Sequence, residues 1–239
     1  MGTQPLAAQV NTNELESTPF IELHSLYEMF PNQHGPRGNE ETLQHELQQE
    51  FSAALSALTL TLKVKDPQLY EHSRRVQQLI HRLAQTLRLP QEEALMIELA
   101  GLFHDIGKLS IHNDVLQKAS CLTRQEFEEI KQHSAHGAQI ISQVKMLKRA
   151  VPMVRHHHER WNGHGYPAGL QAEAIPFGAR MIAIADAFDV MTSHRPYITT
   201  RTPTQALEEL RRDAGTQFDP ILVDRFCSCL EVTTTSKHH

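Results

Sequence analysis

The chain has 239 residues with 23 Lys and Arg against 28 Asp and Glu, a formal net charge of −5 at pH 7. This balance argues against bulk electrostatic attraction to DNA or acidic lipid. Apolar residues make up 40% and no apolar run reaches the roughly 20 residues of a membrane span, which is typical of a soluble globular protein. Residues 1–10 lack the pattern of a secretory signal, and three Cys are too few for a disulfide framework. We therefore expect a cytoplasmic protein.

The N-terminal region predicts a leader followed by one long helix. Residues 1–40 mix Pro, Gly, Asn and Gln, with one short helix expected over 20–30. From Glu41 to Leu62, apolar residues recur at spacings of three and four, which predicts a helix, although residues 58–62 also fit a strand. This helix is either part of the core or a connecting or dimerising element. We assign residues 1–62 to this leader and helix.

The remaining pattern is also helical. Thr123 and Glu126 form a predicted capping box that begins one of these helices. Helical patterns cover residues 69–89, 92–104, 124–142, 145–158, 175–192, 203–212 and 220–230. No segment alternates with period two for long enough to form a sheet. The predicted fold class is all-α, with one domain over 63–232 and a disordered tail over 233–239.

The distribution of histidine predicts a metal site. Ten of the 16 His lie between His72 and His164. His104 and Asp105 end a strongly apolar helix, and Asp186 lies in another apolar helix, where an unpaired carboxylate is costly. A single His is more often a surface or capping residue, but a cluster with carboxylates favours metal binding. Further nitrogen ligands are available from His72, His133, His157 and His158.

These motifs resemble those of the HD superfamily of metal-dependent phosphohydrolases. The chain also contains longer segments that match one subfamily: residues 104–108 (HDIGK), His133, 157–167 (HHERWNGHGYP), 186–197 (DAFDVMTSHRPY) and 215–220 (GTQFDP). Through these segments the chain is more narrowly similar to the HD-GYP subfamily of bacterial cyclic di-GMP phosphodiesterases. The resemblance extends over residues 66–230 and leaves about the first 60 uncovered.

The resemblance implies a helical bundle that holds two, sometimes three, metal ions, usually iron or manganese. The implied activity is hydrolysis of cyclic di-GMP to pGpG, with further hydrolysis to GMP left open. A hydroxide bridging the two ions would attack the phosphodiester, and Lys108 would balance charge on the phosphate. Asp105 would bridge the ions. The implied ligands are His72, His104, Asp105, His133, His157, His158 and Asp186.

The resemblance also implies substrate contacts, and the chain departs from the family pattern at Ile198, Gln68 and Asn162. Arg195 is expected to contact a phosphate, with Lys118 as an additional phosphate partner. Tyr166 lies in a turn-rich loop, where it could stack on a purine or form a contact surface for a diguanylate cyclase-type partner. Ile198 stands where the family often has a second basic residue. Gln68 replaces the Glu that supplies a third metal, so we expect two metals.

Two smaller expectations also concern the site. Asn162 replaces the family's usual Asp and should preserve the turn while removing a charge. His136, His156 and His164 are expected behind the ligands or on the surface.

Alternative functions are a non-catalytic cyclic dinucleotide receptor and a phosphohydrolase of another nucleotide, such as cyclic GMP-AMP. The presence of every implied ligand and of Lys108 disfavours the receptor, whereas Ile198 keeps the other substrate open.

Overall fold

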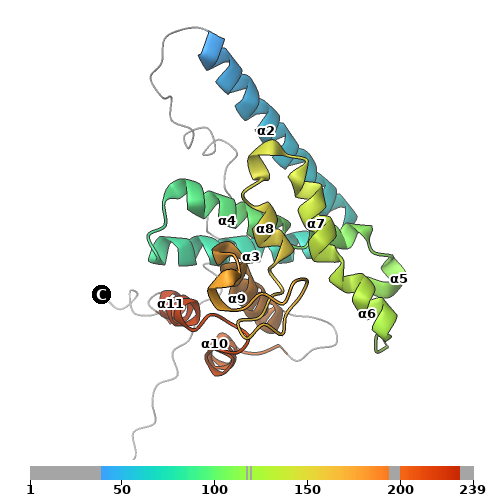
Figure 1. Cartoon of the computed structure of the whole chain (residues 1–239), viewed down its shortest axis with the longest axis vertical. Coiled ribbons are helices and arrows are strands. Elements are labelled where there is room, and N and C mark those ends of the chain that lie inside the picture. The colour runs from blue at the N-terminus through green and yellow to red at the C-terminus, as the bar shows by residue number, and fades with distance from the viewer. Residues whose placement is uncertain (1–38, 117, 119, 194–199, 232–239) are drawn as a thin grey trace, which may run out of the picture.

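The computed structural model describes residues 39–116, 118, 120–193 and 200–231 (Figure 1). The helix expected over 20–30, the substrate residue Arg195, Ile198 and the expected tail over 233–239 lie outside these ranges. The predicted boundary after residue 62 falls within a continuous helix, and the division into two segments stays a prediction.

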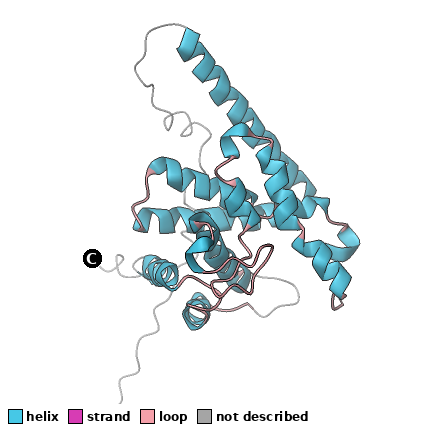
Figure 2. Ribbon diagram, in the orientation of Figure 1, coloured by secondary structure: helices cyan, strands magenta, loops and turns pink. Residues whose placement is uncertain are grey.

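The described residues form helices, which confirms the all-α prediction (Figure 2). Among them no strand occurs, and only two isolated bridges join backbone segments. The order is α2 (Asn39–Lys65), α3 (Pro67–Thr86), α4 (Gln91–Phe103), η2 (Ile106–Ser110), α5 (Asn113–Leu116), α6 (Arg124–Lys131), α7 (His133–Ser142), η3 (Lys145–Leu147), α8 (Val151–Arg155), η4 (Ala172–Ala174), α9 (Phe177–Thr192), α10 (Pro203–Arg212) and α11 (Pro220–Glu231), where η marks a 3-10 helix.

Two of the predicted helices are interrupted. The helix expected over 124–142 is divided into α6 and α7, because the backbone tightens at Gln132, whose N–H donates to Glu129 at 3.0 Å. The helix expected over 145–158 is also wrong. Pro152 lies in the first turn of α8, the position that tolerates a missing N–H, and His156, His157 and His158 form a turn after α8. The strand alternative for residues 58–62 is wrong, since α2 continues through them.

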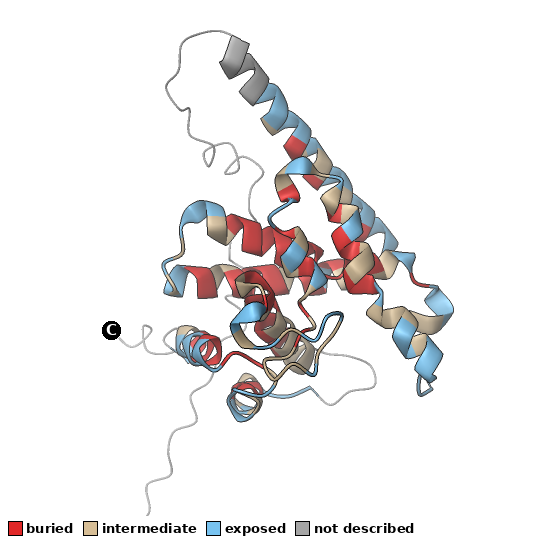
Figure 3. Ribbon diagram, in the orientation of Figure 1, coloured by how far each residue is buried: buried red, intermediate tan, exposed pale blue. Residues whose placement is uncertain are grey.

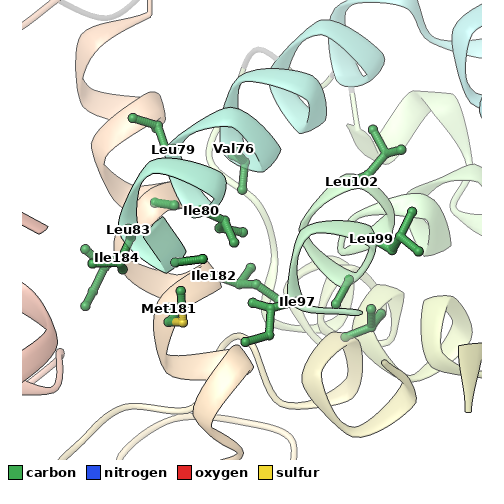
Figure 4. Packing of buried hydrophobic residues seen from close by; sticks show 14 of the residues in the cluster. Val76, Leu79, Ile80, Leu83, Ile97, Leu99, Leu102, Met181, Ile182 and Ile184 are labelled. Carbon is green, nitrogen blue, oxygen red and sulfur yellow. The ribbon is translucent and has the colours of Figure 1, made fainter. Parts of the chain in front are cut away.

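The core lies between α3, α4 and α9 (Figures 3 and 4). The α3 residues Val76, Ile80 and Leu83 recur at spacings of four and three, so one face of this helix is apolar and is fully buried. Nearly every residue of α4 from Leu95 to Phe103 is buried, because neighbouring helices cover several of its faces. This rigid centre carries the helix ends from which the site is built.

Helix α2 contributes to the core along one face only. Phe51, Leu55 and Leu62 are buried and belong to this core, while Leu60 and Val64 are exposed. The N-terminal part of α2 extends beyond the other helices (Figure 1). None of the described helices is long and apolar enough to cross a membrane.

One buried carboxylate in this core gives a pH-dependent contribution to stability. Glu98 of α4 accepts a hydrogen bond from His81 Nδ1 of α3 at 2.8 Å, and this bond raises the pKa of His81 against the opposing effect of burial. A raised pKa stabilises the fold fully below the unfolded value of about 6.5, and the contribution is lost as pH rises through the folded value. We expect the stability advantage of wild type over His81→Gln to shrink by about 1 kcal/mol or less between pH 6 and pH 9, because the imidazole is 37% exposed. Urea unfolding at both pH values measures this difference, and a pH-independent difference would contradict it.

Candidate metal centre

Seven side chains with metal-binding atoms converge from five separate segments of the chain. These segments are α3, the turn between α4 and η2, the first residue of α7, the turn after α8, and α9. The residues are His72, His104, Asp105, His133, His157, His158 and Asp186. The structure thus brings together every ligand implied by the sequence.

The seven residues form two groups, and within each group the ligand atoms lie within 4.8 Å of one another. One group contains Asp105, His133, His157 and His158. The other contains His72, His104 and Asp186. Each group thus offers at least three ligand atoms, which is enough to hold one metal ion.

Asp105 lies between the two groups. Its Oδ1 is 3.2 Å from His133 Nε2, and its Oδ2 is 3.4 Å from His104 Nε2 and 3.8 Å from His72 Nε2. The carboxylate therefore presents one oxygen to each group. This geometry fits the bridging role that the resemblance implied for Asp105.

The backbone fixes the orientation of three imidazoles. Each Nδ1 lies 2.6–2.7 Å from the carbonyl oxygen three residues earlier: Gly101 for His104, Ile130 for His133 and Val154 for His157. With Nδ1–H donating to a carbonyl, Nε2 carries the lone pair that can bind a metal. The helix ends thereby select both the tautomer and the direction of these rings.

Two buried polar atoms of the centre lack hydrogen bonds to any described protein group. They are His104 Nε2 and Asp105 Oδ1. Leaving such atoms unsatisfied is costly, and each of them points toward one of the two groups. A cation at each group would satisfy both atoms, and the all-nitrogen-and-oxygen ligand set suits a divalent metal.

The protonation states of His157, His158 and Asp105 also suit metal binding. Burial lowers the pKa of His157 well below its usual value, and burial together with neighbouring imidazole lowers the pKa of His158 to about 4. Burial of Asp105 opposes ionisation, but the ammonium of Lys108 and the adjacent imidazoles outweigh it and hold the pKa of Asp105 well below its usual value. At neutral pH His157 and His158 are neutral and Asp105 is ionised, as metal ligands must be. His72 differs, because burial, which disfavours its charged form, is outweighed by its contacts with Asp186 and Asp189, and these raise its pKa to about 9, so a metal ion bound there displaces a proton.

Asp186 is partly exposed, because 20% of its side-chain surface is open to solvent. It lies on the α9 face directed at His72, with its Oδ1 3.2 Å from His72 Nε2. The second group is therefore accessible from solvent.

A family model described as an HD domain matches residues 57–222. The chain belongs to the HD domain family. A cyclic di-GMP phosphodiesterase of Thermotoga maritima is 34% identical over 174 residues, which cover 72% of this chain and 47% of that protein. A 3'3'-cGAMP-specific phosphodiesterase 2 of Vibrio cholerae is 37% identical over 155 residues, which cover 64% of this chain and 30% of that protein.

A solved structure described as an HDG"Y"P protein from Bdellovibrio bacteriovorus aligns with a TM-score of 0.57 and 20% identity. The alignment covers 87% of this chain and 69% of that chain, and it shows a shared fold. The HD domain spans less than half the length of the curated relatives described above. The resemblance to HD phosphohydrolases that the motifs indicated is confirmed.

Among the remaining predicted site residues, Lys108 and Tyr166 lie beside the metal-binding residues. Lys108 Nζ is 2.5 Å from Asp105 Oδ2. The Tyr166 ring stacks on the imidazole of His158, and the two ring centroids are 4.8 Å apart. Burial and the nearby carboxylates raise the pKa of Tyr166, so its hydroxyl stays protonated. Lys118 instead binds both carboxylate oxygens of Glu126 at 2.6–2.7 Å.

Sequence analysis missed Glu159, which anchors the loop that carries Tyr166. The buried Glu159 carboxylate accepts hydrogen bonds from the backbone N–H of Ala168 at 2.7 Å and of Leu170 at 3.0 Å. Asn162 Oδ1 accepts from His164 N at 3.2 Å and preserves the turn. Glu159 directly follows the two ligand histidines, and this adjacency was the available signal.

Sequence analysis also missed Asp189 and Arg75. Asp189 is buried on α9 and accepts a hydrogen bond from His72 Nδ1 at 2.7 Å, and it also binds Arg75 of α3. Its signal was the spacing of three residues from Asp186, which places both carboxylates on one helix face. Of the histidines expected behind the ligands, His136 contacts Ser110 at 2.7 Å.

Proposed function

We propose that this HD domain is a phosphodiesterase that hydrolyses cyclic di-GMP to pGpG at a centre of two divalent metal ions. The observation that carries the proposal is the division of seven ligands into two groups with Asp105 between them. The cyclic di-GMP phosphodiesterase of Thermotoga maritima supports the substrate class. Further hydrolysis of pGpG to GMP is part of the same proposal, with the extent left to measurement.

Iron and manganese are the proposed metals, because imidazole and carboxylate ligands without thiolate suit them. Bound divalent ions supply Lewis-acid stabilisation of the phosphate and a water acidic enough to attack at neutral pH. The chain itself contributes the ligand geometry. Asp105 keeps the two groups at a fixed separation, and Lys108 supplies positive charge beside Asp105 where charge accumulates on the phosphate oxygens.

Three further residues are proposed to hold the substrate. Tyr166 presents an aromatic surface beside His158 on which a guanine base could stack. Arg195 is proposed to bind a phosphate, because a guanidinium forms two parallel hydrogen bonds to phosphate oxygens. Lys118 is proposed as an additional phosphate partner, and it would have to exchange its contact with Glu126 for the substrate.

A second candidate substrate is cyclic GMP-AMP. The 37% identity with the cGAMP-specific phosphodiesterase of Vibrio cholerae favours it, as does Ile198 in place of a second basic residue. A non-catalytic receptor is the remaining alternative. The complete ligand set and Lys108 at 2.5 Å from Asp105 disfavour it.

The deciding experiment is anaerobic turnover of cyclic di-GMP and, in parallel, of 3'3'-cGAMP by protein loaded with iron or manganese. We expect linear dinucleotide as the first product. Preference for cGAMP would favour the second substrate. If fully metallated protein binds a cyclic dinucleotide without hydrolysing it, the receptor replaces the enzyme.

The metal content provides a separate prediction. Gln68 is exposed at the start of α3, and a neutral amide is a poor ligand beside clustered cations. We expect two metal ions per chain, and Gln68→Ala should leave this number unchanged. Elemental analysis of both proteins measures it, and a third ion lost on substitution would contradict it.

Lys108 provides a prediction that separates catalysis from metal binding. Lys108→Met keeps the aliphatic stem and removes the charge beside Asp105. We expect kcat to fall by about 100-fold, as for removal of one positioned electrostatic group, while two metals stay bound. Steady-state kinetics and elemental analysis on the same sample measure both quantities. Unchanged kcat at full metal content would remove Lys108 from the mechanism.

Partners and location are also part of the proposal. The exposed Leu60 and Val64 of α2 support a homodimer formed through this helix, which light scattering can test. The loop that carries Tyr166 is proposed to bind a diguanylate cyclase-type partner. None of the three cysteines forms a disulfide in the described residues, which favours a reducing compartment, so we propose the cytoplasm. The catalytic domain is proposed to span residues 63–232.

A further inference from the structure

Helices α3 and α9 face each other with two matched pairs of side chains. Each pair is spaced by three residues, which places both members on one helix face. His72 and Arg75 belong to α3, and Asp186 and Asp189 belong to α9. His72 joins the pairs, because its Nε2 is 3.2 Å from Asp186 Oδ1 and its Nδ1 is 2.7 Å from Asp189 Oδ2.

The support of His72 differs from that of His104, His133 and His157. Those three rings donate to carbonyl groups of their own helix or turn, which are present wherever that segment folds. His72 donates to a carboxylate from another helix, 117 residues away in sequence. Its orientation therefore depends on one side chain that substitution can remove without breaking the backbone.

Arg75 holds Asp189 in place. Arg75 Nε and Nη2 donate to the two oxygens of Asp189 at 2.6 and 3.0 Å. Asp189 is only 3% exposed, whereas the Arg75 side chain is 34% exposed and extends toward solvent. A bidentate guanidinium fixes the plane of the carboxylate, and the carboxylate in turn fixes the plane of the imidazole.

We propose that Asp189, fixed by Arg75, is a positioning residue for the metal ion held by His72, His104 and Asp186. The Asp189 carboxylate orients the His72 ring and increases the basicity of Nε2, so this group loses affinity when the contact is removed. The group that contains His133, His157 and His158 has no contact with Asp189 among the described interactions and keeps its affinity. The inference rests on the metal-binding part of the proposed function and is independent of the substrate.

The experiment titrates metal-free protein with Co²⁺, followed by calorimetry and by the visible absorption bands that report the ligand set. Wild type should show two classes of site. In Asp189→Ala we expect one class to weaken by about 10- to 100-fold and the other to stay unchanged. Asp189→Asn should weaken the same class less, because its amide oxygen can still accept from His72 Nδ1. Arg75→Gln should act on that class too, and these two milder variants serve if the Ala protein does not fold.

A matched control is available elsewhere in the same chain. Asp219 is also buried, at 4% exposed, and it binds Arg180 at 2.6 Å. Asp219→Asn therefore removes a buried ion pair of similar chemistry without contact to the metal centre. We expect it to lower the melting temperature and leave both Co²⁺ classes intact.

The outcomes separate the inference from the proposed function. If Asp189→Ala and Asp219→Asn both weaken the two Co²⁺ classes to the same extent, Asp189 has only a general structural role and the inference is overturned. The inference is also overturned if both classes are unchanged in Asp189→Ala. Selective weakening of one class supports it, even if wild type does not hydrolyse cyclic dinucleotides. Absence of Co²⁺ binding by wild type would overturn both.

Discussion

Asp105→Asn should abolish measurable turnover of cyclic dinucleotides, with a fall in kcat/KM of about 10³-fold or more. The substitution keeps the size of the side chain but replaces one oxygen with an amide nitrogen that does not bind metal. Because each oxygen of Asp105 faces a different ligand group, either orientation of the amide damages one group. A loss of about 4 kcal/mol of transition-state stabilisation corresponds to this fall in rate.

The metal content distinguishes Asp105 from a ligand of one group only. We expect Asp105→Asn to lower both metal classes, whereas Asp186→Asn should lower the class that includes His72 and His104. Asp224→Asn, which changes an exposed carboxylate on α11, is the control and should retain two metals and full activity. Two bound metals and more than a tenth of wild-type activity in Asp105→Asn would rule out the bridging role.

The resemblance implied the seven ligands, whereas the residues by themselves predicted a metal site because buried His and Asp side chains are costly elsewhere. A His-Asp pair at the end of an apolar helix, such as His104 and Asp105, has few stable environments apart from a metal site. The periodic apolar residues of α3 likewise predicted the helix that presents His72. In both cases the signal is local, lies within one helix and does not depend on how helices meet.

The features that were missed depend on contacts between distant segments. Asp189 acts through His72, which lies 117 residues away, and its spacing of three residues from Asp186 indicates a shared helix face but not which side chain that face meets. Glu159 directly follows the two ligand histidines, but its role depends on the backbone of Ala168 and Leu170 turning back onto its carboxylate. The break between α6 and α7 also depends on contacts between distant segments, because α7 begins at His133 and packs against η2.

That packing between α7 and η2 leads to a large expected effect for Gly107→Ala. A Cβ at residue 107 would lie 1.9 Å from the carbonyl oxygen of His133 and 2.5 Å from the amide nitrogen of Gly137. Both atoms belong to the backbone, so no side chain can rotate away and η2 must separate from α7. We expect a loss of about 3 kcal/mol or more in the free energy of unfolding.

Separation of η2 from α7 should also remove metal from the centre. Gly107 lies between Asp105 and Lys108 in the sequence, and it packs against the backbone of the ligand His133. We expect Gly107→Ala to lose the metal class of His133 even below its melting temperature, as measured by Co²⁺ titration. Gly137→Ala is the matched control from the opposite side of this contact. Its Cβ would lie 3.2 Å from Val154 Cγ1 and 3.3 Å from the backbone nitrogen of Gly107, and shifts of a few tenths of an ångström relieve these contacts. The control should therefore be destabilised less and keep both metal classes, whereas equal losses in the two variants would show that the backbone contact at Gly107 does not position the metal centre.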